Sequence, residues 1–335
     1  MSQEVKRVMV PWVEKYRPKN IDEVVYQEEA VNVLKQCLKG DDFPNLLFYG
    51  PPGTGKTSTI LALAREMFQD QFSSRVLELN ASDERGIAVI REKVKRFAQQ
   101  TVSRSENGNK YPPFKIIVLD EADSMTQSAQ ACLRRIMEKE TKSTRFCIIC
   151  NYISRIIDPI VSRCSKFRFK PLQQDLVMEK LATICNSENI SLENDVVLTE
   201  LIKVSGGDLR KAITFLQTAY RLKGDEILTI NDVREVTGYI PENWIDMFVE
   251  ACQKQSYENV EDVLNSMVAE GFSGAQLLNQ LHDWVLGENC LLTDEQISEL
   301  IEALALADYR LLEGADEFLQ TFNVASVFIQ LLGKK

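Results

Sequence analysis

Histidine is almost absent from this 335-residue chain, in which His282 is the only one. Eight cysteines are present but scattered, and Cys147 and Cys150 form a single C-x-x-C pair inside the apolar run RFCIICN. Because a structural zinc site needs four ligands and no second pair follows, we expect buried, reduced thiols rather than a disulfide, metal or redox role.

Long apolar runs are also missing. No segment approaches the roughly 18 uninterrupted apolar residues of a membrane span. The first residues, MSQEVKRVMVPW, lack the apolar stretch of a secretory signal. The sequence therefore predicts a soluble intracellular protein with no membrane partner.

Negative charge is concentrated at one end of the chain, whose formal net charge is −10. Residues 1–224 hold 34 Lys and Arg against 28 Asp and Glu, a net of +6, whereas residues 225–335 hold 5 against 21, a net of −16. A phosphate-binding surface needs only a local positive field. The overall acidity therefore does not exclude nucleic acid as a partner of the first two thirds.

Short apolar runs alternate with helical periods from residue 45. The runs NLLFYG, RVLELN, FKIIVLD and RFCIICN are separated by helical spacings at about 56–68, 86–100 and 126–139, and SRCSKFRFK adds one more strand. Continuous apolar strands that alternate with amphipathic helices predict an α/β fold with a parallel sheet covered on both faces. The polar segment 103–113 is expected to be a surface loop.

The strand signal ends near Pro171. Residues 172–223 show apolar spacings of three and four with a break at SGGD, and five or so further helical segments follow from about Gly238 onward. We therefore expect three domains: an α/β nucleotide-binding domain over 1–171, a small helical domain over 172–238 and an all-α domain over 239–335.

A phosphate-binding motif follows the first apolar run. Residues 50–57, GPPGTGKT, fit the P-loop pattern G-x-x-x-x-G-K-[ST] between a strand and a helix. Its glycines let backbone N–H groups turn toward phosphates, Lys56 would reach the β and γ oxygens, and Thr57 would offer a hydroxyl to Mg²⁺. ATP and Mg²⁺ are the expected cofactors; a Gly/Pro-rich turn that binds nothing is the alternative.

The acidic pair Asp120-Glu121 ends the apolar run FKIIVLD, about 65 residues after the P-loop. Ligands of open α/β sheets lie at the carboxyl ends of the strands. Asp120 would hold Mg²⁺, and Glu121 would orient and deprotonate the attacking water. The letters DEAD at 120–123 also suggest an RNA helicase, but the second domain with an H-R-x-G-R element is missing.

Three polar residues are weak signals when each is taken alone. Asn151 ends the run RFCIICN and could position water near the γ-phosphate, or simply cap a turn. Arg163 lies in Ser162-Arg163-Cys164, where an arginine is usually a surface charge. Arg210 follows Asp208, which could cap a helix and direct Arg210 toward a phosphate.

Together with WVEKYRP at 12–18 and LNASDERG at 79–86, these motifs resemble the small subunits of replication factor C, the eukaryotic AAA+ sliding-clamp loader. The resemblance extends over essentially the whole chain and is densest from residue 10 to 215. It implies an AAA+ P-loop domain, a helical lid and a C-terminal collar that joins subunits in a ring. The implied function is ATP-dependent opening of the clamp and its placement on primer–template DNA for replication and repair.

The resemblance also implies roles for single residues. Val13 and Arg17 would border the adenine and phosphate side, and Asn151 and Arg210 would be the first and second sensors of the nucleotide. Arg163 would be an arginine finger that acts on the ATP of a neighbouring subunit. The residues expected to wrap the triphosphate are Gly50, Pro51, Pro52, Gly53, Thr54, Gly55, Lys56, Thr57 and Ser58.

The implied partners are the other clamp-loader subunits, one large and several small, a sliding clamp of the proliferating-cell-nuclear-antigen type, and primer–template DNA bound without sequence specificity in the nucleus. Residues 84–110 carry seven basic side chains against three acidic ones. Among them, Arg85, Arg91 and Lys95 are predicted to contact duplex phosphates, with a solvated helix face as the alternative. The helix over 122–140 would contact the clamp through Met125, Leu133 and Ile136, unless these three pack in the core.

Two other classes of function remain open at this point. A metabolic P-loop kinase would need an acceptor pocket and would work as a single chain. A scaffold that binds ATP without hydrolysing it would be expected to lack Lys56, Asp120 or Glu121, all of which are present.

Overall fold

The computed structural model describes residues 10–24, 27–39, 43–82, 87–100, 111–224, 226–287 and 292–333. The chain divides into two compact units, residues 1–190 with 201–217 and residues 191–200 with 218–335. Each unit is described by itself. Within the described residues, no helix is both long and apolar enough to cross a membrane.

The first unit contains a parallel sheet with the strand order β2-β3-β4-β1-β5. The strands are β1 (Leu46–Tyr49), β2 (Val76–Asn80), β3 (Lys115–Asp120), β4 (Thr144–Cys150) and β5 (Ser165–Arg168). From β1 the chain crosses to β2 at one edge of the sheet and returns through β3 to β4, which lies next to β1. The carboxyl ends of β1, β3 and β4 therefore lie near the point where the strand order reverses. The predicted parallel sheet is confirmed.

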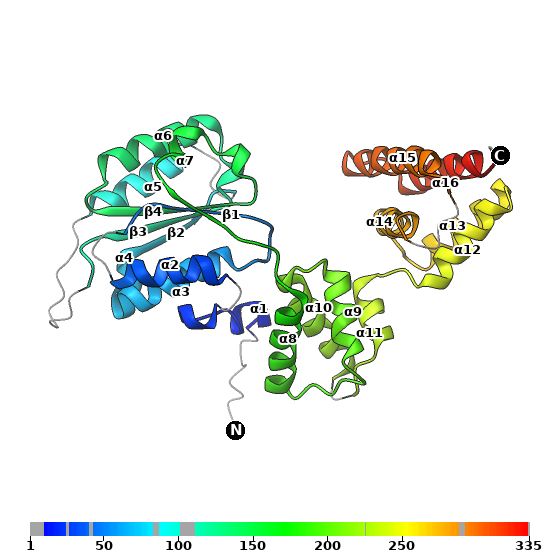
Figure 1. Cartoon of the computed structure of the whole chain (residues 1–335), viewed down its shortest axis with the longest axis horizontal. Coiled ribbons are helices and arrows are strands. Elements are labelled where there is room, and N and C mark those ends of the chain that lie inside the picture. The colour runs from blue at the N-terminus through cyan, green and yellow to red at the C-terminus, as the bar shows by residue number, and fades with distance from the viewer. Residues whose placement is uncertain are drawn as a thin grey trace, which may run out of the picture. The chain divides into compact units, whose positions relative to one another are not determined.

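Helices cover both faces of this sheet (Figure 1). One face carries α2 (Glu28–Lys39), α3 (Lys56–Phe68) and α4 (Phe72–Arg75), and the other carries α5 (Ile87–Gln99), α6 (Gln127–Lys139) and α7 (Asp158–Val161). Successive strand residues alternate between the two cores, so Ile116 and Val118 pack on the first face while Ile117 and Leu119 pack on the second. The continuous apolar runs of the sequence follow from this two-sided burial.

Shorter elements connect these layers. They are α1 (Trp12–Lys15) and the 3₁₀ turns η1 (Ile21–Glu23), η2 (Gln69–Gln71), η3 (Ala122–Ser124) and η4 (Ile153–Arg155). These elements were not predicted from the sequence, because a single turn is too short to show a helical period.

After β5 the described chain forms helices and no further strand. The next four are α8 (Gln174–Glu188), α9 (Val196–Ser205), α10 (Leu209–Lys223) and α11 (Ile230–Thr237). The predicted break at SGGD separates α9 from α10, where Gly206 and Gly207 have φ of 62° and 78°. This left-handed backbone suits glycine and ends α9.

Within the second unit, the described residues from 240 onward form five helices around one apolar core. The helices are α12 (Glu242–Gln253), α13 (Tyr257–Ala269), α14 (Gly274–Val285), α15 (Asp294–Leu312) and α16 (Glu317–Gly333). Ser256, Ser273 and Thr293 cap the amino ends of α13, α14 and α15 through their hydroxyl oxygens. The interior is nearly all aliphatic and aromatic, and Phe328 is 2% exposed.

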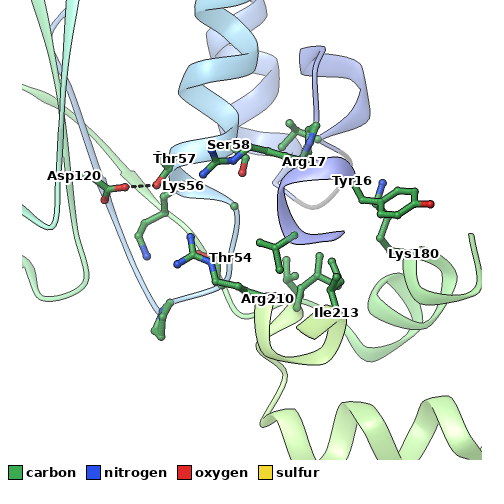
Figure 2. A pocket seen from close by; sticks show the side chains of 18 of the residues that line it. Tyr16, Arg17, Thr54, Lys56, Thr57, Ser58, Asp120, Lys180, Arg210 and Ile213 are labelled. Atoms are coloured by element: carbon green, nitrogen blue, oxygen red, sulfur yellow. Dashed lines mark hydrogen bonds between the residues drawn. The ribbon is translucent and has the colours of Figure 1, made fainter. Parts of the chain in front are cut away.

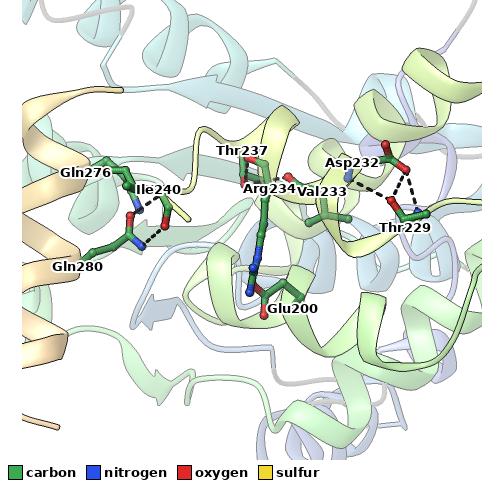
Figure 3. A network of polar contacts seen from close by, with 9 residues as sticks. All are labelled: Glu200, Thr229, Asp232, Val233, Arg234, Thr237, Ile240, Gln276 and Gln280. Atoms are coloured by element: carbon green, nitrogen blue, oxygen red, sulfur yellow. Dashed lines mark hydrogen bonds and ion pairs between the residues drawn. The ribbon is translucent and has the colours of Figure 1, made fainter. Parts of the chain in front are cut away.

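A set of polar contacts orders α11 and the residues that follow it (Figure 3). Thr229 and Asp232 form a capping box at the start of α11, and Arg234 donates to Glu200 at 2.9 Å. The Gln280 side chain accepts from the Ile240 backbone N–H and donates to its carbonyl, both at 2.9 Å. These bonds satisfy backbone groups that the apolar core would otherwise leave without partners.

Candidate nucleotide site

The loop between β1 and α3 is shaped by close backbone approaches. Gly50 has φ of 145°, and a Cβ there would lie 2.2 Å from the Phe169 carbonyl oxygen. Gly55 has φ of 87° and precedes the first residue of α3, Lys56. Glycine at these positions lets the loop turn its N–H groups toward the amino end of α3, an arrangement that binds phosphate.

Lys56 is 7% exposed and points along this loop. Its Nζ donates to the Gly50 and Pro51 carbonyls at 2.7 Å each and to Asn151 Oδ1 at 2.9 Å. Burial lowers the pKa of Lys56, and the nearby Asp120 carboxylate opposes that shift. A buried ammonium held this way is ready to exchange loop carbonyls for phosphate oxygens.

Thr57 and Asp120 supply a hydroxyl and a carboxylate at one point. Thr57 Oγ1 donates to Asp120 Oδ2 at 2.6 Å (Figure 2). A side-chain oxygen from α3 and one from β3 therefore lie next to each other. Asp120 Oδ1 also accepts from the backbone N–H of Glu121 at 2.9 Å. Hard oxygen donors of this kind fit Mg²⁺, which is commonly held by one or two protein ligands together with substrate phosphates.

Glu121 leaves the sheet on a left-handed backbone, with φ of 52°. Such a φ is uncommon outside glycine and costs of order 1–3 kcal/mol. The residue lies at the carboxyl end of β3, its side chain is exposed, and it lines the same pocket as Lys56 and Asp120. That position suits a base for water.

Asn151, at the end of β4, is held from two sides. Its side-chain oxygen accepts from Lys56, and its backbone N–H donates to Asp123 Oδ2 at 3.3 Å. The backbone N–H of Tyr152 donates to the same Asp123 oxygen at 3.3 Å. Asp123, the last letter of DEAD, therefore orients the end of β4 rather than the nucleotide loop.

The remaining walls come from the N-terminal segment and from α8 and α10 (Figure 2). Val13 and Arg17 line the pocket beside Arg210. The segment is anchored by buried Trp12, whose backbone N–H donates to Gln217 Oε1 at 3.1 Å, and by Tyr16, whose hydroxyl donates to Glu188 at 2.5 Å. Further pocket residues that the sequence analysis did not predict are Tyr16, Pro18, Val24, Leu172, Lys180, Leu209 and Ile213.

The start of α10 also touches the phosphate loop. Asp208 Oδ1 accepts from the backbone N–H of Arg210 at 2.8 Å and of Lys211 at 3.4 Å, which confirms the expected cap. A Cβ at Gly53 would lie 2.0 Å from the same Asp208 oxygen. The loop and α10 thus meet at Gly53, where only a hydrogen fits.

Comparisons with known proteins agree with this site. The model of the ATPase family associated with various cellular activities (AAA) matches residues 46–172, the RCF1/5-like AAA+ ATPase lid domain matches 179–221, and the replication factor C C-terminal domain matches 240–327. The chain is 57% identical to human replication factor C subunit 4 over 97% of its own length and 89% of that protein. The chain belongs to the replication factor C family.

Other relatives in the family are similar over the same length. The chain is 51% identical to replication factor C subunit 2 of Schizosaccharomyces pombe, covering 97% of the chain and 95% of that protein. It is 47% identical to subunit 2 of Saccharomyces cerevisiae, covering 96% and 93%. The predicted family, the AAA+ fold, the ATPase activity and the clamp-loader function that the family carries are confirmed by these matches.

A solved structure of a Thermotoga maritima RuvB variant shares the fold. Its TM-score is 0.51 at 14% identity, and the match covers 76% of this chain and 84% of that one. At this identity the likeness supports the α/β architecture with its helical continuation and nothing more.

Arg163, the family's expected finger, does not line this pocket. It follows α7, and its side chain donates to the Pro159 carbonyl and to Glu138 Oε1, both at 2.6 Å. About two fifths of the side chain is exposed.

The other predicted nucleotide residues take part in the site in two ways. Gly50 and Pro51 contribute through backbone carbonyls that accept from Lys56. The rest line the pocket directly: Val13, Arg17, Pro52 to Ser58, Asp120, Glu121, Asn151 and Arg210.

The predicted DNA residues are only partly described. Arg85 lies outside the described residues, and for Arg91 the structure describes the α5 backbone but not the side chain. Lys95 is exposed on α5, while Val94 beside it is buried. Met125, Leu133 and Ile136 are 6%, 1% and 8% exposed within the core, so the expectation that these three contact a clamp is wrong.

Cys147 and Cys150 are buried in β4, as expected for structural thiols. Burial raises the pKa of Cys150 to about 12 and that of Cys147 well above its ordinary value. Neither thiol is therefore a thiolate at neutral pH. The described part of the chain contains no cluster of three or more metal-binding side chains of the His, Cys, Asp and Glu types.

Proposed function

We propose that this chain is an ATP-hydrolysing motor subunit of a clamp loader, in which nucleotide binding holds a sliding clamp open and hydrolysis on DNA releases it. The observation that carries the proposal is the convergence of Lys56, Thr57, Asp120, Glu121 and Asn151 at the carboxyl ends of three parallel strands. The chain would occupy one of several positions in a hetero-oligomeric ring and would act in the nucleus.

The residues divide into three roles in this proposal. Lys56 and the N–H groups of residues 53–58 bind the phosphates, and Thr57 with Asp120 holds Mg²⁺, which supplies charge neutralisation when bound. Glu121 removes the proton of the attacking water, and Asn151 orients that water next to the γ-phosphate. Arg210, whose backbone N–H donates to Asp208, senses the bound nucleotide, and the apolar side chains of Val13 and Ile213 line the pocket.

We assign the arginine finger to Arg163, acting on the ATP of the neighbouring subunit. Its absence from the lining of its own pocket and its exposure support an action in trans. A finger stabilises the charge that develops on the transferred phosphoryl group, which is worth about 10³–10⁵ in rate. Hydrolysis would then depend on assembly.

Three domain roles complete the proposal. Residues 1–171 form the ATPase domain, residues 172–238 form the lid and residues 239–335 form the collar that joins subunits. Exposed Lys95, together with Arg85 and Arg91, would contact duplex phosphates without reading sequence, so that the protein recognises a primer–template junction. A clamp of the proliferating-cell-nuclear-antigen type would bind the ATPase domain.

The deciding experiment measures ATP hydrolysis by the reconstituted complex that contains this chain, with and without clamp and primed DNA. We expect Arg163→Ala to lower the stimulated rate at the neighbouring site by about 10³-fold or more, with ATP binding at this chain's own P-loop retained. Arg221→Ala, an exposed arginine of α10, is the matched control and should leave the rate unchanged.

The same assay separates a clamp-loader subunit from an enzyme that works as a single chain. Full activity from the isolated chain, indifferent to DNA and to Arg163, would mean a self-contained ATPase or kinase and would overturn the proposal. A wild-type rate for Arg163→Ala in the complex would remove the finger assignment while leaving the ATPase site intact.

A further inference from the structure

A carboxylate of α6 holds the side chain of Arg163. Glu138 Oε1 accepts from Arg163 Nη2 at 2.6 Å, and the Pro159 carbonyl accepts from Nη1 at 2.6 Å. The guanidinium is therefore fixed at two of its nitrogens, by a side chain of α6 and by the backbone of α7. Counted against the described residues, two of its five N–H donors are used and three remain for an oxyanion.

Glu138 also contacts a second arginine of its own helix. Arg134 lies one turn earlier on α6, and its Nε is 3.7 Å from Glu138 Oε1. Residues four apart on a helix share a face, so the geometry of the pair is set by α6 itself. Arg134 Nε is buried and makes no hydrogen bond within the described residues, so its 3.7 Å approach to Glu138 is an ion pair without a hydrogen bond.

The charge of this group decides what Glu138 can do. Arg134, Glu138 and Arg163 together carry a net charge of +1, because the single carboxylate is shared by two guanidinium groups. An approaching triphosphate would therefore meet a positive group even with Glu138 in place. The carboxylate does not have to leave, and it can orient the guanidinium in the way that the third member of a catalytic triad orients its base.

We infer that Glu138 is a positioning residue for the arginine finger: it holds Arg163 in one orientation, with Arg134 offsetting its negative charge, so that the finger is already ordered when a neighbouring subunit presents its ATP. This inference rests on the proposed function, since it gives Glu138 a role through Arg163. Arginine loses side-chain conformational freedom when it is fixed. Fixing it beforehand leaves less of that loss to the hydrolysis step.

The expected effect is modest because the ion pair is about two fifths exposed. Exposed pairs of this kind are worth about 0.2–1 kcal/mol, which converts to at most about a fivefold change in rate. We therefore expect Glu138→Gln to lower kcat at the neighbouring site about twofold to fivefold with KM unchanged. Ordering of the finger matters in the transition state, whereas substrate binding at that site does not require it.

The test uses the assembled complex with clamp and primed DNA, in which only the ATP site facing Arg163 can hydrolyse. Four versions of this chain are compared: wild type, Glu138→Gln, Arg163→Ala and the double variant. Glu226→Gln, which removes an exposed carboxylate 4.0 Å from Lys223, serves as the ion-pair control and should retain the wild-type kcat. Thermal unfolding of each chain is measured in parallel, and equal melting temperatures are expected.

A reduced kcat for Glu138→Gln that disappears in the Arg163→Ala background supports the inference, because Glu138 then acts through the finger. Three results overturn it: a wild-type rate for Glu138→Gln, a raised rate that would make Glu138 a brake, or an equal loss with and without Arg163. A wild-type rate for Arg163→Ala alone would overturn the finger assignment itself, and this inference with it.

Discussion

The nucleotide pocket and the C-terminal helical core use their residues in opposite ways. Around the pocket the chain accepts costly arrangements: a buried ammonium at Lys56, a left-handed backbone at Glu121 and glycines pressed against neighbouring atoms. In the core around Phe328 nearly all buried side chains are apolar, the buried Gln280 amide has its hydrogen bonds satisfied by Ile240, and helix ends are capped by Ser and Thr hydroxyls. Around the pocket these costly features occur together, whereas the described C-terminal helices have one left-handed non-glycine residue, Gln255 with φ of 53°, and otherwise ordinary apolar packing.

The largest difference expected between these two regions is at Lys56. Lys56→Met keeps most of the side-chain volume and removes the ammonium that binds Gly50, Pro51 and Asn151. Because that charge would stabilise the transferred phosphoryl group, we expect ATP turnover to fall on the order of 10³-fold, as when other transition-state charge donors are removed. Turnover and nucleotide affinity are measured on the assembled complex and the full chain.

The comparison would fail if Lys56→Met also unfolded the C-terminal helices. We expect their melting transition to stay in place, since the substitution replaces a costly buried charge with an apolar side chain. Loss of both transitions together would mean that the pocket and the helical core do not differ in the way described.

Phe328→Ala tests the other region. The ring is 2% exposed and lies 6.0 Å from that of Trp284 in an edge-to-face arrangement. Removing a buried phenyl group costs about 3–5 kcal/mol, from lost burial and from the cavity that remains. Thermal and denaturant unfolding should show this loss in the C-terminal transition, while nucleotide affinity at the P-loop stays unchanged.

Leu319→Ala is the control for this variant, because Leu319 is 61% exposed on α16. Substitutions at exposed positions change stability by less than about 0.5 kcal/mol. A weakened nucleotide affinity in Phe328→Ala at temperatures where both units are folded would contradict the separation of the two regions.

The sequence predicts these two regions unequally well. The helix expected over 56–68 has those bounds in the structure, and the P-loop and Asp120-Glu121 meet as expected, because strand, loop and helix chemistry are local there. Leu209, Ile213 and Lys180 were missed, since nothing local separates a helix face that lines a pocket from one that faces solvent. For Met125, Leu133 and Ile136 the sequence left a clamp contact and core packing both open, because apolar spacing indicates burial but does not identify the surface that covers it; the structure places all three in the core.

The partner of Arg163 was equally hidden. Glu138 and Arg163 are 25 residues apart, and their 2.6 Å contact depends on how α6 and α7 pack. For the C-terminal helices, periodicity predicted five or so helical segments. Where three of them begin became clear only in the structure, in which Ser256, Ser273 and Thr293 are the capping residues. A collar role came from family resemblance alone.

Gly53 is a glycine of the phosphate loop that the P-loop motif does not require. The P-loop pattern fixes Gly50 and Gly55 but allows any residue at position 53, whereas the structure gives Gly53 φ of 72° and places Asp208 2.0 Å from a Cβ there. Gly53→Ala therefore combines backbone strain with displacement of the cap of α10, and strain of this kind alone costs of order 1–3 kcal/mol. We expect nucleotide affinity to fall about tenfold or more, measured by titration of the full chain.

Gly238→Ala separates strain from collision. Gly238 ends α11 with φ of 64° and has no heavy atom within 4 Å of the added Cβ, when counted over the described residues. It should lower stability by a similar strain and leave nucleotide affinity unchanged. If Gly53→Ala behaves like Gly238→Ala, the contact between the phosphate loop and α10 has no part in binding. If instead Asp208→Gly partly restores nucleotide affinity in the Gly53→Ala background, the Asp208 carboxylate is the obstacle. The position of α10 is then coupled directly to the loop that binds the phosphates.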